Sequence, residues 1–326
     1  MSADLAPPRV LITGGDGFVG RYLVRALAAS LPSGREIIVG AHGPRAEDAA
    51  GVRRVPLDIT DADQVSFTLA AERPTHVFHL AAIAAIGAAR SNVRQTWAVN
   101  FGGALNVAIA VEETIPICRL IYCGSGAVYG SSGSSGRPFD ESAPLDPADA
   151  YGASKAAADL MVGQMAKQGL RAIRLRPFNH TGPGQSEHFV VPAFAAQIAA
   201  IERGEQEPVI HVGSLTSRRD FLDVRDVVDA YVRAVLRFDD LPVGCALNVA
   251  SGRAISMGEI LDILLAMSSK TVEVRQDTSR LRNNDASVII GDASRARRLL
   301  DWQPRTDITA TLGAVLDYYR DRAHAP

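Results

Sequence analysis

The sequence predicts an α/β protein: a doubly wound parallel sheet followed by a smaller α/β lobe. In the first half, short apolar runs typical of buried strands alternate with amphipathic helical stretches. A glycine cluster directly follows the first apolar run, and the regular alternation loosens after Arg176-Pro177. We therefore expect one domain over residues 1–176 and a second over 177–326, with an approximate boundary that the chain can cross again.

The expected elements are taken in chain order. Strands of the first domain are expected at 9–13, 37–39, 52–55, 76–80, 120–123 and 171–175. Its helices are expected at 61–71, 93–113 and 149–168, after a first helix with Val19, Leu23, Leu27 and Leu31 on one side. In the second half, helices at 189–202, 224–238 and 257–267 alternate with strands at 209–212, 247–250 and 272–274. Because crossovers are right-handed, the carboxyl ends of the parallel strands meet along one edge, where ligands bind.

Composition excludes several classes of protein. The 326 residues are 47% hydrophobic and 21% charged, and the formal net charge of −2 gives no general drive toward nucleic acid or an anionic membrane. The longest apolar run, at residues 80–89, is far shorter than the roughly 20 residues of a membrane helix. Three cysteines without metal-type spacing, and no signal pattern at residues 1–9, predict a cytoplasmic chain with no metal site.

The glycine cluster at residues 13–20 closes the first strand and opens the first helix. Gly14 allows a sharp turn, Gly17 lets a pyrophosphate approach the backbone, and Gly20 lets the helix pack closely on the strand. The free N–H groups at the start of the helix then face the anion. This placement predicts a dinucleotide site of the Rossmann type, although such a cluster can also be a plain structural turn.

The end of the second strand bears on which dinucleotide binds. Dinucleotide domains often carry an acid there that binds the adenosine ribose. The segment 39–45 has no acid and ends in Arg45, which favours a 2′-phosphate and hence NADP(H) over NAD(H). The preference is slight, because Arg45 can equally be a solvated surface residue.

Three side chains point to proton transfer at a carbonyl or alcohol oxygen. Tyr151 and Lys155 are four residues apart on an expected helix and share a face, and Lys155 is one of only three lysines in the chain. A cation beside a phenol favours the phenolate and lowers its pKa. Ser125 follows an apolar strand and can donate to the same substrate oxygen. Each residue alone also has an ordinary explanation, a solvated helix face or a turn.

These motifs occur in order with Asp58-Ile59-Thr60, His79-Leu80-Ala81-Ala82, Val99-Asn100 and Val128-Tyr129-Gly130. Together they resemble the extended short-chain dehydrogenase/reductases, over essentially the whole chain. The resemblance implies a nicotinamide cofactor, a nucleotide-activated sugar as substrate and a Ser125–Tyr151–Lys155 triad. Tyr151 would be the acid/base, Lys155 would hold the ribose and Ser125 would orient the sugar oxygen. It places the cofactor against Gly14, Gly17, Phe18, Val19, Gly20, Asp58, Ile59, Leu80, Ala81, Ala82, Tyr151 and Lys155.

Segments in the second half resemble the substrate loops of the GDP-4-dehydro-6-deoxy-D-mannose reductases. They lie at 176–185, 207–213, 219–226, 248–252 and 280–282. The resemblance implies that Asn179 binds a substrate phosphate and that Arg219 and Arg282 clamp the diphosphate, as paired guanidinium donors can. For either arginine alone, a surface ion pair is the commoner explanation.

Position 127 narrows the reaction. Related 4,6-dehydratases have an acidic residue there and GDP-fucose synthase has a cysteine, whereas this chain has Ala127 beside Gly126. Neither side chain can move a proton, which disfavours dehydration and epimerisation next to the ketone. The resemblance then implies reduction of GDP-4-dehydro-6-deoxy-D-mannose to GDP-D-rhamnose. A nucleotide-sugar 4-epimerase and a nicotinamide-binding regulator without turnover remain as alternatives. The family usually dimerises through two helices, here 93–113 and 149–168, so we expect a homodimer.

Overall fold

The computed structural model describes residues 7–41, 51–130, 137–277 and 288–322. Arg45 and Arg282, to which the sequence gives candidate roles, lie outside these residues, as does the Ser/Gly-rich segment 131–136.

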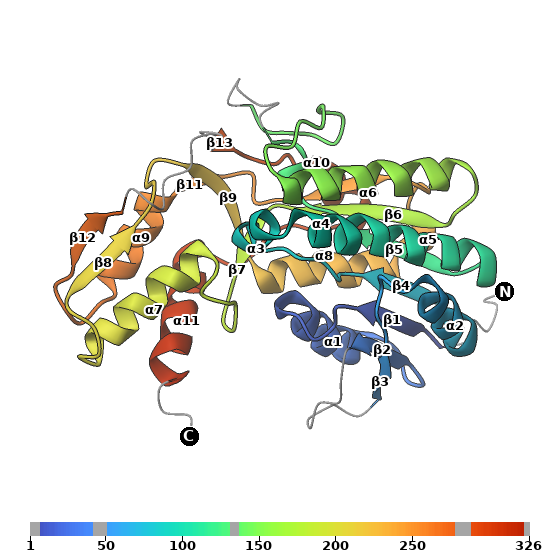
Figure 1. The fold of residues 1–326 in the computed structure, drawn as a ribbon, viewed down its shortest axis with the longest axis horizontal. Helices are drawn as coiled ribbons and strands as arrows, with labels where there is room; N and C mark the ends of the chain where they lie inside the picture. Colours follow the sequence, from blue (N-terminus) through green and yellow to red (C-terminus); the bar gives the residue numbers. More distant parts are fainter. Residues whose placement is uncertain (1–6, 42–50, 131–136, 278–287, 323–326) are drawn as a thin grey trace.

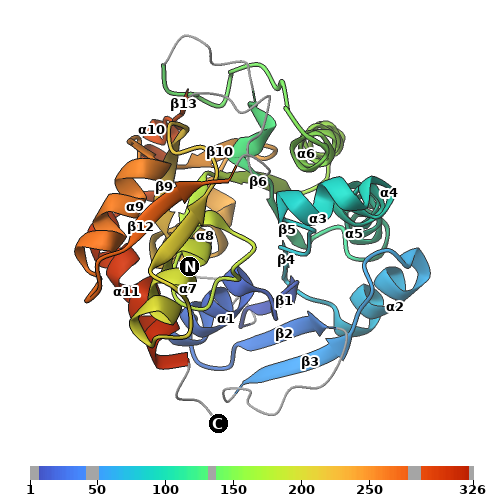
Figure 2. The same cartoon turned by 60° about the vertical axis from the view of Figure 1, so that its left-hand side comes forward.

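A seven-stranded parallel sheet forms the centre of the molecule (Figures 1 and 2). The strand order is β10-β6-β5-β4-β1-β2-β3, which confirms the predicted doubly wound sheet. The strands are β1 (Arg9–Thr13), β2 (Glu36–Ala41), β3 (Val52–Pro56), β4 (His76–His79), β5 (Arg119–Cys123), β6 (Ala172–Pro177) and β10 (Ala246–Val249).

Both faces of this sheet are buried, because successive side chains of a strand point to opposite sides. On β1, Val10 and Ile12 pack with helices α1 (Phe18–Ser30), α8 (Val224–Leu236) and α10 (Ser294–Leu300). Leu11 faces the opposite way. It packs with α2 (Ala62–Glu72), α5 (Gly103–Thr114) and α6 (Ala150–Lys167).

The predicted helix over 93–113 is not continuous. It consists of α4 (Val93–Trp97), the π-helix η1 (Ala98–Gly102) and α5, preceded by α3 (Ile86–Ser91). A π-helical turn widens the helix and occurs often at functional sites. Here it carries Asn100, whose contacts are described below.

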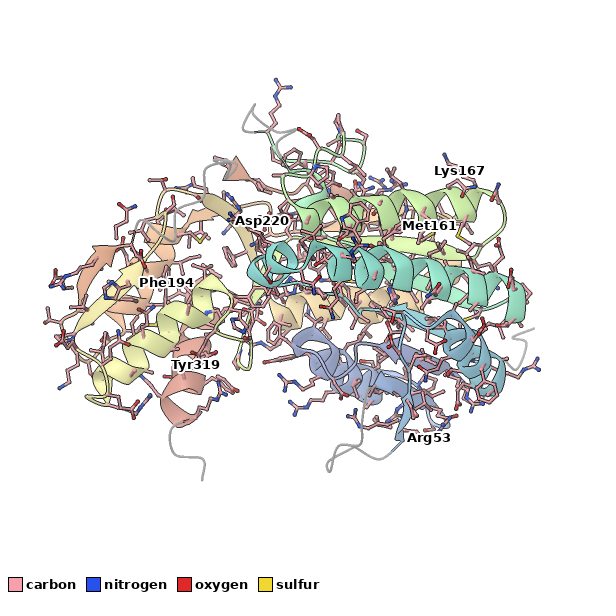
Figure 3. All side chains as sticks on the ribbon, in the orientation of Figure 1. Arg53, Met161, Lys167, Phe194, Asp220 and Tyr319 are labelled. Carbon is pink, nitrogen blue, oxygen red and sulfur yellow. The ribbon has the colours of Figure 1, made fainter. Side chains whose placement is uncertain are left out.

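The smaller lobe lies beside the carboxyl ends of the central strands (Figure 1). Phe194 and Tyr319 belong to its apolar core (Figure 3). It contains helices α7 (Val190–Glu202), α9 (Met257–Ala266) and α11 (Ile308–Asp321). Its strands are β7 (Asn179–Thr181), β8 (Val209–Val212), β9 (Arg218–Asp223), β11 (Ala254–Ser256), β12 (Glu273–Gln276) and β13 (Val288–Ile289). Short 3-10 turns occur at η2 (Gly126–Val128) and η3 (Phe238–Asp240).

The chain returns to the central sheet after β9. The strand expected at 247–250 within the smaller lobe is β10, which pairs with β6, and α8 packs on α1. Sequence periodicity reports which face of an element is buried, but not which neighbour buries it. The predicted domain boundary near residue 176 therefore concerns only the point where the chain first leaves the central sheet, and it stays a prediction.

A buried ion pair joins α6 to β6 and, through two further side chains, to β10. Asp159 on α6 is fully buried and accepts from Arg174 Nη1 at 2.7 Å and from Arg176 Nη2 at 2.7 Å. Arg176 Nη1 also donates to the Tyr129 hydroxyl at 2.8 Å. That hydroxyl donates to Asn248 Oδ1 at 2.7 Å. Each member of this buried polar network has its partner, which is the condition for stability.

Removal of the carboxylate should destabilise the fold strongly. In Asp159→Ala, Arg176 stays buried without its counter-charge, so we expect a loss of about 3–5 kcal/mol in the free energy of unfolding. Urea denaturation followed by circular dichroism measures it. Glu273→Gln is the matched control, because its ion pair with Arg275 is exposed on both sides. Similar urea midpoints for the two variants would contradict a structural role for Asp159.

Candidate active site

The glycine loop between β1 and α1 forms a bare backbone cradle. Gly14 has a φ of +71°, and a Cβ there would lie 2.8 Å from the backbone of Ala81. A Cβ on Gly20 would collide with the backbone of Gly14 and Gly15. Gly17 is the N-cap residue of α1, and no described side chain caps this helix end. Its N–H groups are therefore available to an anion, and the loop fits the pyrophosphate of a dinucleotide.

The strand next to β1 ends at the same edge and is tied to this loop. The Thr13 hydroxyl and His79 Nδ1 share a hydrogen bond of 2.8 Å, and the Ala81 N–H donates to the Thr13 oxygen at 3.3 Å. Burial lowers the pKa of His79 to about 3, so the ring is neutral at physiological pH. Leu80, Ala81 and Ala82 are partly exposed beyond the end of β4, where the resemblance places the nicotinamide.

Asn100 fixes the loop that follows β4. Its side chain accepts from the Ile83 N–H at 2.8 Å and donates to the Ser154 hydroxyl at 3.0 Å. The loop is thereby held against α6, one residue before Lys155. Asn100 is part of a family motif in the sequence, but its role was not predicted. An amide within an otherwise apolar helical stretch is the signal that could have indicated one.

Two further predicted cofactor residues, Asp58 and Ile59, follow β3. Asp58 accepts from the Thr60 N–H at 2.9 Å and from the Thr60 hydroxyl at 2.7 Å, which closes a tight turn. Ile59 is buried against Gly103, and its carbonyl accepts from Asn106 Nδ2 at 2.9 Å. Both residues lie at the carboxyl edge of the sheet, where ligands bind in this class of fold.

The structure brings Ser125, Tyr151 and Lys155 together. Ser125 follows β5 and accepts from the Ala127 N–H at 3.1 Å as the cap of η2. Tyr151 is in the first turn of α6, whose N-cap Asp149 accepts from the Gly152 N–H at 2.7 Å. One turn later, Lys155 Nζ donates to the Cys123 carbonyl at 2.6 Å, two residues before Ser125. The exit of β5 and the first two turns of α6 thus form one group.

The pKa of Tyr151 is raised in the structure, whereas the sequence predicts that it is lowered. Burial raises the pKa of Tyr151 to about 12, and an interaction with Ser125 lowers it by less. Lys155 is not among the main groups acting on that phenol, and desolvation lowers the pKa of Lys155 itself. The Lys155 ammonium is directed at the Cys123 carbonyl, and the lowering of the Tyr151 pKa by Lys155 stays a prediction. At neutral pH the phenol is protonated and suited to donate.

Neither residue after Ser125 can abstract a proton from carbon. Gly126 has no space for a side chain, and Ala127 has no ionisable group. A Cβ on Gly126 would lie 2.9 Å from the Phe178 ring. Ala127 is partly exposed and carries only a methyl group. Steric crowding by Phe178 thus excludes a larger residue at one position, and the sequence supplies no acid at the other.

Two of the three residues predicted to bind the substrate phosphates lie on neighbouring strands of the smaller lobe. Asn179 is exposed at the start of β7 and is in register with Phe221 on β9, two residues after Arg219. Arg219 Nη1 donates to the Arg218 carbonyl at 2.8 Å. The His180 ring stacks on Phe18 at the start of α1, with centroids 6.4 Å apart. The β7 segment therefore meets the glycine loop, which places the expected substrate and cofactor residues side by side.

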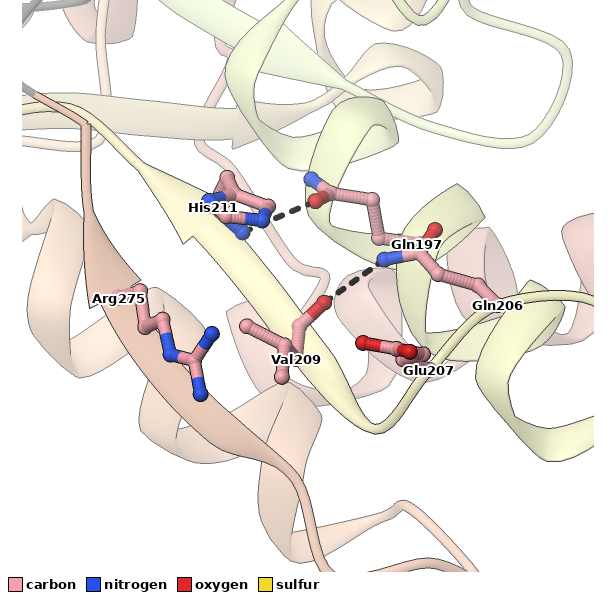
Figure 4. A pocket seen from close by; sticks show the side chains of 6 residues that line it. All are labelled: Gln197, Gln206, Glu207, Val209, His211 and Arg275. Carbon is pink, nitrogen blue, oxygen red and sulfur yellow. Dashed lines mark hydrogen bonds between the residues drawn. The ribbon is translucent and has the colours of Figure 1, made fainter.

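A separate pocket of about 500 Å³ lies on the smaller lobe (Figure 4). Gln197 Oε1 accepts from the His211 N–H at 3.1 Å, and Gln206 Nε2 donates to the Val209 carbonyl at 2.7 Å. The two glutamines pair with backbone groups of β8 that β12 does not use, which protects this strand edge. Glu207, Val209 and His211 of its lining belong to the segment 207–213 that resembles a substrate loop, but the resemblance assigns no role to any of the three.

The described residues form neither a metal site nor a membrane-spanning helix. Within the described residues, no three His, Cys, Asp or Glu side chains gather as metal ligands would. No helix in the same part of the chain has the length and apolar character needed to cross a membrane.

The fold and this group of residues define a nucleotide-sugar enzyme of the short-chain dehydrogenase/reductase type. The chain belongs to the NAD dependent epimerase/dehydratase family, whose model matches residues 10–250. It is 32% identical to the GDP-6-deoxy-D-mannose reductase of Pseudomonas aeruginosa, over 96% of this chain and 98% of that protein. The structure of RMD from Pseudomonas aeruginosa complexed with NADPH matches with a TM-score of 0.83 and 30% identity, over 97% and 99% of the two chains.

Epimerases are also similar. The UDP-glucose 4-epimerase of Streptomyces lividans is 27% identical, over 92% of this chain and 93% of that protein. The chain is therefore a nucleotide-sugar enzyme that binds a nicotinamide dinucleotide. Similarity to both reductases and epimerases is compatible with either reaction.

The glycine loop should tolerate no side chain at residue 20. In Gly20→Ala, the new methyl group displaces the backbone of Gly14, so we expect the Kd for NADPH to rise at least about tenfold, which is roughly 1.4 kcal/mol. Fluorescence titration measures it. Gly87→Ala is the control, because a Cβ there meets nothing within 4 Å. Unchanged NADPH binding by folded Gly20→Ala would show that this loop is not the cradle.

Proposed function

We propose that this chain reduces the C4 ketone of GDP-4-dehydro-6-deoxy-D-mannose to the alcohol of GDP-D-rhamnose, with NAD(P)H as the reductant. The observation that carries the proposal is a protonated Tyr151 beside Ser125, with no acid at position 127. Such a group can complete a reduction but cannot abstract a proton from carbon. The similarity to a GDP-6-deoxy-D-mannose reductase over nearly the whole chain supports the choice of sugar.

The reduction needs one hydride and one proton. The reduced nicotinamide, when bound, supplies the hydride to C4. Tyr151 gives its phenolic proton to the C4 oxygen, and its pKa of about 12 keeps that proton in place until the oxygen becomes basic. Ser125 can donate to the same oxygen and orient it. Lys155, almost fully buried, donates to the Cys123 carbonyl, and the family resemblance assigns its ammonium to the ribose of the bound cofactor.

The similarity to a UDP-glucose 4-epimerase supports a second candidate. A 4-epimerase uses the same triad to oxidise C4 and then reduces it from the other face. Added NAD(P)H is not consumed in that cycle, whereas a ketoreductase consumes one equivalent for each turnover.

The first experiment follows reduced-nicotinamide absorbance after addition of GDP-4-dehydro-6-deoxy-D-mannose, with NADPH and NADH tested side by side. We expect stoichiometric loss with at least one cofactor. No loss with either would overturn the ketoreductase, and interconversion of UDP- or GDP-hexoses without net loss would establish the epimerase.

Tyr151→Phe should separate proton transfer from binding. Loss of the phenolic hydroxyl removes the proton donor, so we expect kcat to fall by about 10²–10⁴-fold. The Kd for NADPH, measured by fluorescence, should stay within about threefold of the parent value. Full activity in this variant would remove Tyr151 from the mechanism.

We also propose a homodimer through the helices around α4 and α6. Three large apolar side chains are exposed there: Val93 and Trp97 on α4 and Leu160 on α6. The two helices pack side by side, so these residues can form one surface.

Leu160→Glu should convert the dimer to a monomer, because it places a charge within the proposed interface. Light scattering coupled to gel filtration measures the mass. Phe67→Glu is the matched control, since Phe67 is exposed on α2, outside this surface. A parent chain that is monomeric at micromolar concentration would contradict the proposal.

A further inference from the structure

The ammonium of Lys155 is buried, and burial disfavours its charged form. The residue is 3% exposed, and desolvation lowers the pKa of Lys155 below its ordinary value. Its Nζ atom donates to the Cys123 carbonyl at 2.6 Å, but a carbonyl carries no net charge. A charged Lys155 therefore needs further stabilisation from its surroundings.

The titratable groups around this ammonium supply little counter-charge. Burial raises the pKa of the Cys123 thiol and lowers the pKa of His79 to about 3, so both are neutral at physiological pH. The Tyr151 phenol is protonated as well. Asp159, one helical turn after Lys155, acts to raise the Lys155 pKa, but its carboxylate is shared by the two arginines of β6.

The ring of Tyr122 supplies a further interaction. Lys155 Nζ lies over this ring, 5.0 Å from its centroid. The face of an aromatic ring carries partial negative charge and attracts a cation at this distance, most strongly where both groups are desolvated. Tyr122 is 1% exposed, so solvent does not weaken the attraction.

Contacts to the sheet and to the helix hold the Tyr122 ring in this position. Tyr122 on β5 is in register with His79 on β4, and their rings stack with centroids 6.1 Å apart. The Tyr122 hydroxyl donates to the Lys155 carbonyl at 3.4 Å, and burial raises the pKa of this phenol, which keeps it neutral. The ring therefore lies between a neutral imidazole of the sheet and the turn of α6 that carries the ammonium.

We propose that Tyr122 is a positioning residue for Lys155, whose ammonium its ring face holds at the exit of β5 and keeps charged. The inference rests on the proposed function, in which this ammonium serves the ribose of the bound cofactor. The ring carries the effect and the hydroxyl does not. An aliphatic side chain of similar size would fill the same space without a negative face.

The first test measures the pKa of Lys155 directly, without cofactor or sugar. The chain has three lysines, so protein labelled with ¹³C at lysine Cε gives one NMR resonance for each, and Lys167→Arg and Lys270→Arg assign them. In Tyr122→Leu we expect the pKa of Lys155 to fall by at least about 1, because loss of the ring disfavours the charged form. In Tyr122→Phe the ring remains, and the pKa should stay within about 0.3 of the parent value. Lys167, exposed at the end of α6 (Figure 3), is the internal reference.

A second test changes the charge of the ring face and leaves the packing nearly unaltered. Phenylalanine carrying one, two or three ring fluorines is incorporated in place of Tyr122, and each fluorine withdraws electrons from the face. We expect the pKa of Lys155 to fall with each fluorine. A purely structural role predicts the same pKa throughout the series, and this comparison decides the question even if Tyr122→Leu does not fold.

Cofactor binding should follow the same change. A charged donor binds a ribose oxygen more strongly than a neutral one, so NADPH affinity should weaken as the pH rises through the pKa of Lys155. In Tyr122→Leu this weakening should begin at a pH lower by at least about 1, as measured by fluorescence titration across pH.

An unchanged Lys155 pKa in Tyr122→Leu or along the fluorinated series would overturn the proposal. Equal falls in Tyr122→Phe and Tyr122→Leu would overturn it too, because they would assign the effect to the hydroxyl. A fall in the Lys155 pKa with NADPH binding unaltered would support the role of the ring, and would instead contradict the part that the proposed function gives Lys155. Since the NMR titration contains no sugar, absence of ketoreductase turnover does not affect its outcome.

Discussion

The carboxylate of Asp159 has no contact with solvent and is held by two arginines of β6, and the geometry of the catalytic group depends on this contact. Asp159 lies one helical turn after Lys155, so the ion pair fixes α6 on the sheet close to the functional side chains. Its Oδ2 atom also lies beside Gly124, where a Cβ would come within 3.4 Å. Gly124 precedes Ser125, and the same carboxylate therefore limits the path of the β5 exit. Asp159 thus constrains both α6 and the exit of β5, two segments that are distant in sequence.

This dependence explains which parts could be predicted. Alternating apolar residues and a glycine cluster are local patterns, and they sufficed for the parallel sheet and for the position of the cradle. The sequence did not predict that β10 belongs to the central sheet. An apolar strand pattern does not indicate which strand lies beside it. Similarly, Asp159 reads as one more polar residue on a helix until Arg174 and Arg176 are seen to converge on it.

The catalytic group shows the same division between local and long-range information. Helical spacing was enough to place Tyr151 and Lys155 on one face. The pKa of Tyr151 was not accessible from spacing, since it depends on burial and on whether the ammonium is directed at the phenol or at the Cys123 carbonyl. The steric limit at Gly126 likewise comes from Phe178, more than fifty residues away in the chain. Contacts between residues that are far apart in sequence can be read only from the folded structure.

The cofactor end and the reacting end of the site lead to one conclusion when they are considered together. An enzyme that returns its hydride to the same sugar has little need to distinguish NADPH from NADH, because no cofactor is consumed. A reductase exchanges its cofactor at every turnover, so its glycine loop must release the oxidised dinucleotide each time. Tyr151, protonated and without an acid at position 127, lies in the first turn of α6 beside Ser125, which follows β5. A proton-donating phenol serves both a reductase and the second half-reaction of an epimerase, so net consumption of the cofactor is what distinguishes the two reactions.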